Sequence, residues 1–113
     1  MALVTFYALK PRGLQHLSLN WLHQLEKNEL YLGPNVRLSG LKGMAHIETE
    51  SLANEFAEAC TQRFQERKQP DVQISVVRCE SSPDKALLKR IKSDSEIIKK
   101  RLATGNFSPN KAP

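Results

Sequence analysis

The chain has 113 residues, of which 40% are hydrophobic and 26% charged. This length and composition fit one folded domain and exclude an intrinsically disordered chain. No apolar run reaches the roughly 18 to 20 residues that cross a bilayer, so no membrane partner is expected. The net charge is +5, and its whole excess lies in residues 83–113, which hold eight Lys/Arg and three Asp/Glu, whereas residues 1–82 hold nine of each.

The N-terminal third predicts a strand followed by a helix. Residues 3–9 (LVTFYAL) are β-branched, aromatic and uninterrupted, which is typical of a buried or half-buried strand. Pro11 and Gly13 should end it. Over residues 14–27 the period changes, because apolar residues recur at three- and four-residue steps, at Leu14, Leu17, Trp21 and Leu25. A loop with turn residues then extends to Asn35.

Two strands and a helix are predicted in the middle of the chain. The strands cover 36–38 and 44–49, joined by a turn near Gly40, and Ala45 and Ile47 alternate with polar residues in the second. Ser51 is a candidate N-cap for the helix. The helix carries apolar residues at steps of four, at Leu52, Phe56, Cys60 and Phe64.

A further strand and a basic helix complete the order. Residues 72–79 (VQISVVRC) read as a strand. Ser82 and Pro83 should begin the last helix, which runs to about Ala103 and stops at Gly105. Residues 105–113 are expected to form a disordered tail.

This order predicts an α+β fold of the ferredoxin-like βαββαβ type. Its four-stranded antiparallel sheet would carry two helices on one face, and the other face would be bare. The helices should pack through Trp21, Leu25, Phe56 and Phe64. We expect this domain to occupy residues 1–82, with the basic amphipathic helix added over 83–104.

The segment KGMAHIET, residues 42–49, resembles the octamer on the third strand of RNA recognition motif domains. That octamer begins with a basic residue and Gly, as this segment does, and has stacking aromatics where Met44 and His46 stand here. Its partner motif would be residues 4–9 (VTFYAL), with Thr5 at the position that is normally aromatic. The resemblance implies an RNA-binding domain that holds bases on its sheet.

A second resemblance involves the same fold. A strand followed by PRGL, residues 11–14, and an amphipathic helix is similar to the N-terminal ferredoxin-like domain of some RNA methyltransferases. The resemblance implies a domain that helps to hold RNA and carries no chemistry.

The last helix combines a basic surface with an apolar stripe. Leu88, Ile91, Ile98 and Leu102 recur at helical spacing, interrupted by Ser95, which indicates either a helix docked on the domain or a dimerising seam. The positive field around this helix would attract phosphate backbones or acidic protein surfaces.

We therefore predict a non-catalytic RNA-binding protein. Arg37, Lys42 and the basic helix would hold phosphates, and bases would lie on Tyr7, Met44 and His46. The residues that the helix would contribute are Lys89, Arg90, Lys92, Lys99, Lys100 and Arg101. The alternative is a protein-interaction or assembly module, in which the bare sheet face or the apolar stripe binds a protein partner or a second copy.

No motif for catalysis or a cofactor occurs. The sequence has no phosphate-binding glycine loop, no CxxC and no HExxH. His16 and His23 are seven residues apart, which is wider than the usual spacing of metal ligands. We expect neither enzymatic activity nor a cofactor. Cys60 and Cys79 lie in predicted core elements, and two buried thiols favour a reducing, cytoplasmic location.

Overall fold

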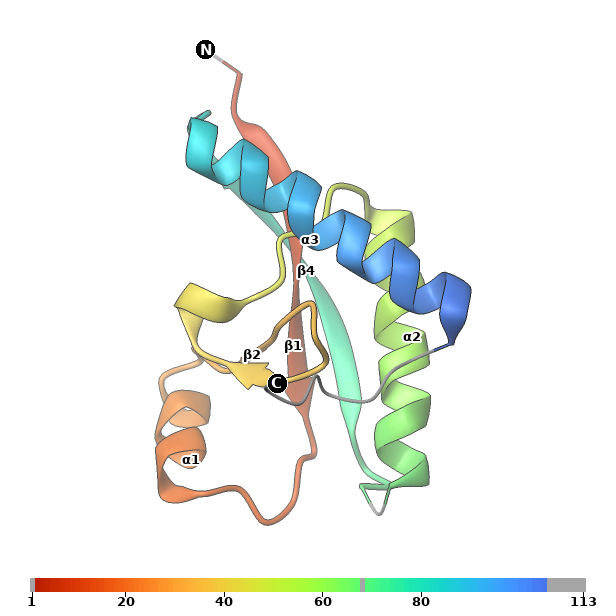
Figure 1. Cartoon of the computed structure of the whole chain (residues 1–113). Helices are drawn as coiled ribbons and strands as arrows, with labels where there is room; N and C mark the ends of the chain where they lie inside the picture. Colours follow the sequence, from red (N-terminus) through yellow and green to blue (C-terminus); the bar gives the residue numbers. More distant parts are fainter. Residues whose placement is uncertain (1, 68, 106–113) are drawn as a thin grey trace, which may run out of the picture.

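The computed structural model describes residues 2–67 and 69–105 (Figure 1). Its helices and strands confirm an α+β chain with antiparallel strands, although their bounds differ in places from the predicted ones. The elements are β1 Val4–Arg12, α1 Leu19–Glu26, β2 Tyr31–Leu32, β3 Leu38–Ser39, the 3₁₀ helix η1 Leu41–Gly43, α2 Glu50–Glu66, β4 Gln73–Ser81 and α3 Lys85–Thr104.

β1 and β4 form an antiparallel ribbon, nine residues long in each strand. The register runs from Val4 opposite Ser81 to Arg12 opposite Gln73, so β1 continues through Pro11. Tyr7 directs its N–H and C=O away from β4, to Ile47. Pro11 lies four residues further along with the same orientation, so the N–H it lacks would not have bonded to β4. The predicted break at Pro11 is therefore wrong.

The predicted four-stranded sheet is also wrong. β1 pairs with β4 in one two-stranded sheet, and β2 pairs with β3 in another. Within the predicted strand 44–49, only Ile47 forms a bridge to β1, through two hydrogen bonds to Tyr7 of 2.8 and 2.9 Å. The reason lies on the other side of this segment, where the N–H groups of His46 and Glu48 donate to side chains of α3 instead of a strand.

α2 confirms the predicted central helix, and Phe56 is fully buried within it. Its N-cap is Thr49 rather than Ser51, because the Thr49 hydroxyl accepts a 3.2 Å hydrogen bond from the N–H of Leu52. Phe64 packs against the edge of the core.

α1 departs most from its prediction. The helix begins at Leu19, capped by Ser18, and none of its residues is buried. Leu25 is 41% exposed, so the expected packing of Trp21 and Leu25 in the core is wrong. His16 adopts a positive φ of 60°, which interrupts the predicted helix before it can start at Leu14. Figure 1 shows α1 beside β2, apart from α2.

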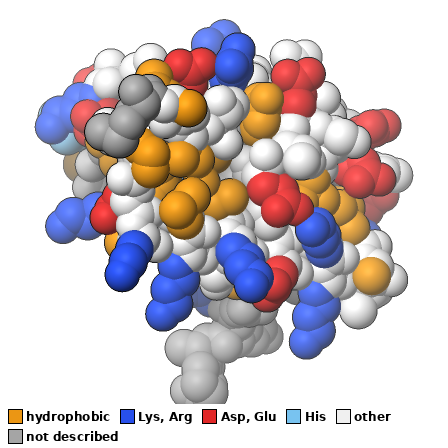
Figure 2. Space-filling view, turned by 90° about the horizontal axis from the view of Figure 1, so that it is seen from above, with side chains coloured by type: hydrophobic (Ala, Val, Ile, Leu, Met, Phe, Trp, Pro, Cys, Tyr) orange, Lys and Arg blue, Asp and Glu red, His pale blue; other side chains and the backbone are white. Residues whose placement is uncertain are grey.

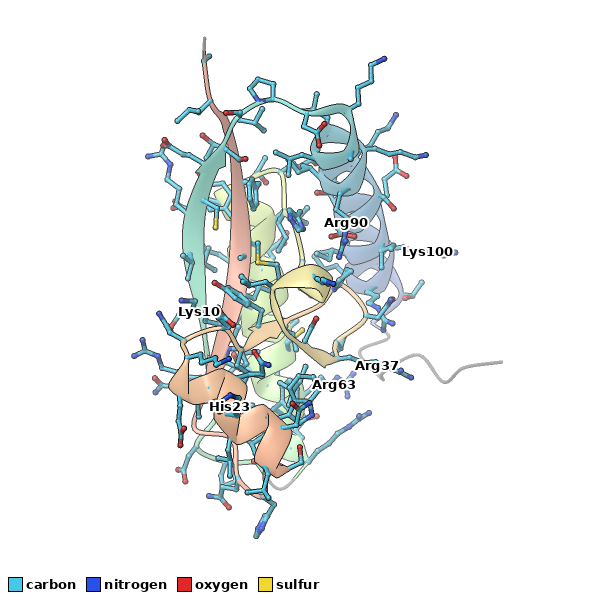
Figure 3. All side chains as sticks on the ribbon, turned by 90° about the vertical axis from the view of Figure 1, so that its left-hand side faces the viewer. Lys10, His23, Arg37, Arg63, Arg90 and Lys100 are labelled. Atoms are coloured by element: carbon cyan, nitrogen blue, oxygen red, sulfur yellow. The ribbon has the colours of Figure 1, made fainter. Side chains whose placement is uncertain are left out.

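The core joins β1, the loop around β2, α2 and α3. α2 and α3 lie on the same side of the β1–β4 ribbon (Figures 1 and 3). The buried residues of this core are Leu9, Leu32, Val36, Ala45, Ile47, Leu52, Ala53, Phe56, Ala57, Cys60 and Ile98. Ile98 belongs to α3, so the last helix shares the core of the preceding residues.

The bounds of α3 agree with the prediction at one end only. Gly105 ends the helix in the left-handed conformation, with φ of 69°, as predicted. The N-cap is Asp84 rather than Ser82. The predicted tail beyond Gly105 lies outside the described residues. Among the described helices, none combines the length and the apolar composition needed to cross a membrane.

Candidate nucleic-acid interface

α3 is docked on the rest of the molecule through one face. Five buried residues, spaced to fall on that face, are Ile91, Asp94, Ser95, Ile98 and Arg101. Of the predicted apolar stripe, Ile91 and Ile98 are buried and Leu102 is half-buried, whereas Leu88 is 50% exposed. The stripe therefore serves mainly to dock α3 on its own domain.

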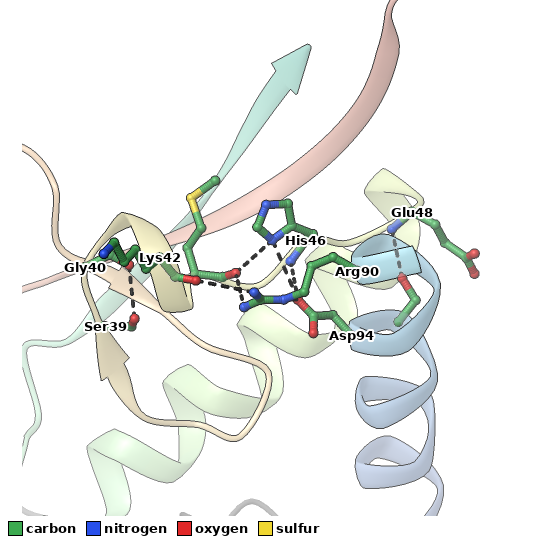
Figure 4. Close-up of polar contacts among 9 residues, drawn as sticks. Ser39, Gly40, Lys42, His46, Glu48, Arg90 and Asp94 are labelled. Carbon is green, nitrogen blue, oxygen red and sulfur yellow. Dashed lines mark hydrogen bonds and ion pairs between the residues drawn. The ribbon is translucent and has the colours of Figure 1, made fainter. Parts of the chain in front are cut away.

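Asp94 is the centre of the contact between α3 and residues 42–48 (Figure 4). Its carboxylate oxygen Oδ2 accepts hydrogen bonds from the main-chain N–H of His46, at 3.0 Å, and from Nε of Arg90, at 2.9 Å. Burial by itself would raise the pKa of Asp94, but the hydrogen bonds from His46 and Arg90 outweigh it and hold this pKa below its usual value. The side chain is therefore an ionised carboxylate at neutral pH.

Arg90 and Ser95 extend this contact. The remaining N–H groups of Arg90 donate to the carbonyl oxygens of Lys42 and Met44, both at 3.3 Å. The hydroxyl of Ser95 accepts the N–H of Glu48 at 3.1 Å. Ser95, the polar residue that interrupts the apolar stripe, thus satisfies a main-chain donor that a neighbouring strand would otherwise take.

Arg101 fixes the other end of α3. Its side chain is buried, and it donates a 3.3 Å hydrogen bond to Oδ1 of Asn35. Burial lowers the pKa of this guanidinium and raises the pKa of the nearby Cys60 thiol to about 12. Arg90 and Arg101, both predicted to hold phosphates, are thus engaged in holding α3 to the loops beside it.

The lysines of α3 point the other way. Lys85, Lys89, Lys92, Lys99 and Lys100 are exposed, and helical geometry places them opposite the buried face, with Glu96 among them. Lys99 forms an ion pair with Glu48, whereas Lys85, Lys89, Lys92 and Lys100 have no ion pair within residues 2–67 and 69–105. Figure 3 shows Lys100 on the outer side of the helix, and Figure 2 shows separate Lys and Arg side chains along the rim of this end of the molecule. We call Lys85, Lys89, Lys92 and Lys100 the lysine ridge.

Lys42 and Arg37 extend the positive surface. Both side chains are exposed. Lys42 lies next to α3, because its carbonyl group accepts from Arg90. Arg37 belongs to the loop that Arg101 contacts through Asn35. The two residues predicted to help to bind phosphate thus lie in segments that Arg90 and Arg101 connect to α3.

The predicted base-stacking residues do not form one platform. Tyr7 is paired with Ile47, and both side chains pack against the core. His46 precedes Ile47 in an extended segment, so its side chain points to the opposite face. The ring of His46 stacks on Phe6, with centroids 4.8 Å apart, and its Nδ1 lies 2.9 Å from the carbonyl oxygen of Met44. The structure thus brings Met44 and His46 together without Tyr7.

Phe6 was absent from the predicted site. The alternation of side chains along β1 could have placed it on the face opposite Tyr7. The ring is only 5% exposed, however, and His46 covers it. This part of the sheet therefore offers no open aromatic surface to a base.

The described residues contain no group of three or more His, Cys, Asp and Glu side chains placed to hold a metal ion. Comparisons with protein-family models, with curated proteins and with solved structures found no match for this chain.

Proposed function

We propose that this protein binds nucleic acid, specifically RNA, without catalysing a reaction, and that the lysine ridge holds the phosphates. The observation that carries the proposal is the docking of α3, which buries Asp94 and leaves four lysines exposed without ion pairs in the described chain. A cation fixed on a rigid helix attracts phosphate with little loss of conformational freedom in the backbone.

A reduced form of the RNA-recognition-motif-like fold belongs to the same proposal. Hydrogen bonds lead from β4 to β1, from Tyr7 of β1 to Ile47, and from Ala45 to Leu32 of β2. This sequence of neighbours supports a ferredoxin-like arrangement in which only the ribbon of β1 and β4 is a regular sheet. The phosphate contacts would then come from α3 rather than from the sheet face.

The mode of binding should be independent of base sequence. Phosphate contacts position a nucleic acid but do not read its bases. The ridge from Lys85 to Lys100 covers about 22 Å of helix, at 1.5 Å per residue, which is enough to follow several phosphates of one strand. Lys42 and Arg37 would add contacts beside it.

The test is the salt dependence of binding to a short single-stranded RNA of mixed sequence. Each phosphate contact adds roughly 0.7 to the slope of log affinity against log salt for a single strand. Replacing Lys89 and Lys92 with Gln should weaken binding and reduce the slope by about 1.4, if each lysine meets one phosphate. Binding is measured by fluorescence anisotropy at several salt concentrations.

A variant with the same change in charge provides the control. Arg12 and Lys27 are exposed and lie outside α3, so R12Q/K27Q should change affinity much less than K89Q/K92Q. Equal effects of the two variants would assign the binding to net charge alone and contradict a specific ridge. Absence of salt-sensitive binding at micromolar concentration would refute the proposed function.

A second candidate function is protein interaction, which the exposure of α1 favours. Leu19 is 86% exposed, and Leu22 and Leu25 are each 41% exposed, at three-residue steps along one side of the helix. If α1 binds a protein partner, L22E/L25E should abolish that binding while the salt-dependent affinity for RNA stays unchanged.

A further inference from the structure

The outer edge of β4 is an open hydrogen-bonding edge. Tyr7 gives both of its main-chain hydrogen bonds to Ile47, so it forms a non-hydrogen-bonded pair with Arg78, its partner on β4. The main-chain groups of Arg78, and of residues two positions away in either direction, then point away from β1. These outward-facing residues are Ile74, Val76, Arg78 and Glu80.

Within residues 2–67 and 69–105, β4 has no strand partner on this outer edge. Most open edges carry a proline, a bulge or a lysine that discourages pairing. β4 (QISVVRCES) has neither proline nor lysine, and its register with β1 is continuous, without a bulge. A strand edge without these features is suited to accept another strand wherever no other element covers it.

α2 flanks only one half of this edge. A groove between α2 and β4 is lined by Thr61, Gln62, Ile74 and Val76, among others. Residues 77–81 of β4 are not part of its lining. Arg78 and Glu80, the two residues of this half whose main-chain groups face outward, are exposed, with 63% and 43% of their side chains accessible. An incoming strand can therefore reach this half of the edge without displacing α2.

We propose that the C-terminal half of β4 pairs antiparallel with β4 of a second copy of this chain, about a two-fold axis at Cys79. The charges along β4 indicate why a second copy is a suitable partner. In this register Arg78 lies opposite Glu80 of the second copy and Glu80 lies opposite its Arg78, so both pairs have opposite charges. A two-fold axis at Arg78 would place the two copies of Arg78 directly opposite each other. A two-fold axis at Val77 would place the two copies of Arg78 at diagonal positions, so like charges would still be neighbours.

The same register also pairs the outward-facing main-chain groups and enlarges the sheet. Arg78 and Glu80 both direct their main-chain groups outward, so they form the hydrogen-bonded pairs between the copies. Arg78 and Glu80 already form a 3.0 Å ion pair within one strand, and pairing joins two such pairs into a square of alternating charge. The two ribbons become a continuous sheet of four strands, a size that is more stable than two.

Cys79 provides a direct readout of the register. It faces itself across the two-fold axis in a non-hydrogen-bonded pair, where Cα atoms are about 4.5 Å apart, within the range that a disulfide spans. Cys79 is half-buried and Cys60 is fully buried. Diamide would oxidise the two thiols to a disulfide, removing two protons and two electrons that convert diamide to the hydrazine.

The experiment combines this cross-link with the mass in solution. Wild type and C60S should give a disulfide-linked dimer on a non-reducing gel after brief diamide treatment, whereas C79S should not. Light scattering without oxidant should report twice the mass of the chain. A monomeric mass at high protein concentration, or a dimer of C79S linked through Cys60, would overturn the proposal.

Charge variants test the partner contacts without altering the core. R78E places Glu opposite Glu in both pairs, so the dimer should dissociate about tenfold more readily. The exchange R78E/E80R restores opposite charges and should restore the dimer. Circular dichroism checks that both variants are folded. Equal dimerisation of wild type and R78E would exclude this register, and failure of the exchange to rescue would do the same.

Discussion

Single side chains of α3 decide how the middle of the chain is held. Asp94 accepts hydrogen bonds from His46 and Arg90 while only 3% exposed. Helical spacing places Ser95 within the apolar stripe of α3, but the sequence alone does not explain why a polar residue stands there. The reason is the N–H of Glu48, which lies 47 residues away in sequence and cannot be inferred from helical spacing.

Replacing Asp94 with Asn should reduce the free energy of unfolding by roughly 2 kcal/mol, because hydrogen bonds to a charged acceptor contribute about 1.5 to 3 kcal/mol. The effect should depend on pH. The pKa of Asp94 is lowered in the folded state, so its contribution is complete above the ordinary carboxyl pKa of about 3.9 and is lost as pH falls through the lower folded value.

Urea unfolding of wild type and D94N from about pH 7 down to about pH 3 measures this difference. The two stability curves should approach each other as pH falls below the ordinary carboxyl pKa of about 3.9. E96Q is the control, because Glu96 is exposed on the same helix. A difference that is constant over the whole range would contradict the role of the ionised carboxylate.

At the scale of elements, the spacing of apolar residues predicted which side chains are buried. It did not predict the main-chain hydrogen-bond partners of each segment. α2 agrees with its prediction because Leu52, Phe56 and Cys60 all contact one core. Ala45 and Ile47 also point into the core, as their alternation predicted, yet the segment around them is not a regular strand. Pairing depends on donors and acceptors from distant residues, and α3 supplies them here.

Two glycines at the ends of elements should respond differently to replacement by Ala. Gly13 has φ of 77°, and an added Cβ would lie 2.1 Å from the carbonyl oxygen of Asp71. Gly105 has a similar φ of 69° with no atom within 4 Å. Both variants incur the conformational penalty of roughly 1 kcal/mol, and G13A adds a clash with main chain.

G13A should therefore be destabilised by at least about 2 kcal/mol, and G105A by about half of that. Urea unfolding of the two variants side by side provides the comparison. A loss in G13A no larger than that in G105A would mean that residues 69–72 can move aside without cost.

At the scale of the whole molecule, α3 is both the charged surface and part of the core. Ile98 is fully buried beside residues of α2 and β1. The predicted boundary at residue 82 describes the charge distribution well, but the packing crosses it. For this reason point variants of the lysine ridge test the proposed RNA binding better than removal of the helix does.

A chain that ends at residue 82 should fail to unfold cooperatively. It would expose the surface that Ile91 and Ile98 cover, and leave the N–H groups of His46 and Glu48 without their acceptors. Thermal melting followed by circular dichroism should give a broad, shallow transition for this fragment. A sharp transition near that of the full chain would mean that residues 1–82 form a complete core by themselves.

The pairing of β1 with β4 also sets a delay during synthesis. Arg12 and Gln73 are partners at one end of the ribbon, and 61 positions separate them. At the usual 5 to 20 residues per second, the apolar first strand waits about 3 to 12 seconds for its partner. During that interval the unpaired main-chain groups and apolar side chains of β1 are exposed, so the chain is most liable to pair wrongly or aggregate before β4 has been made.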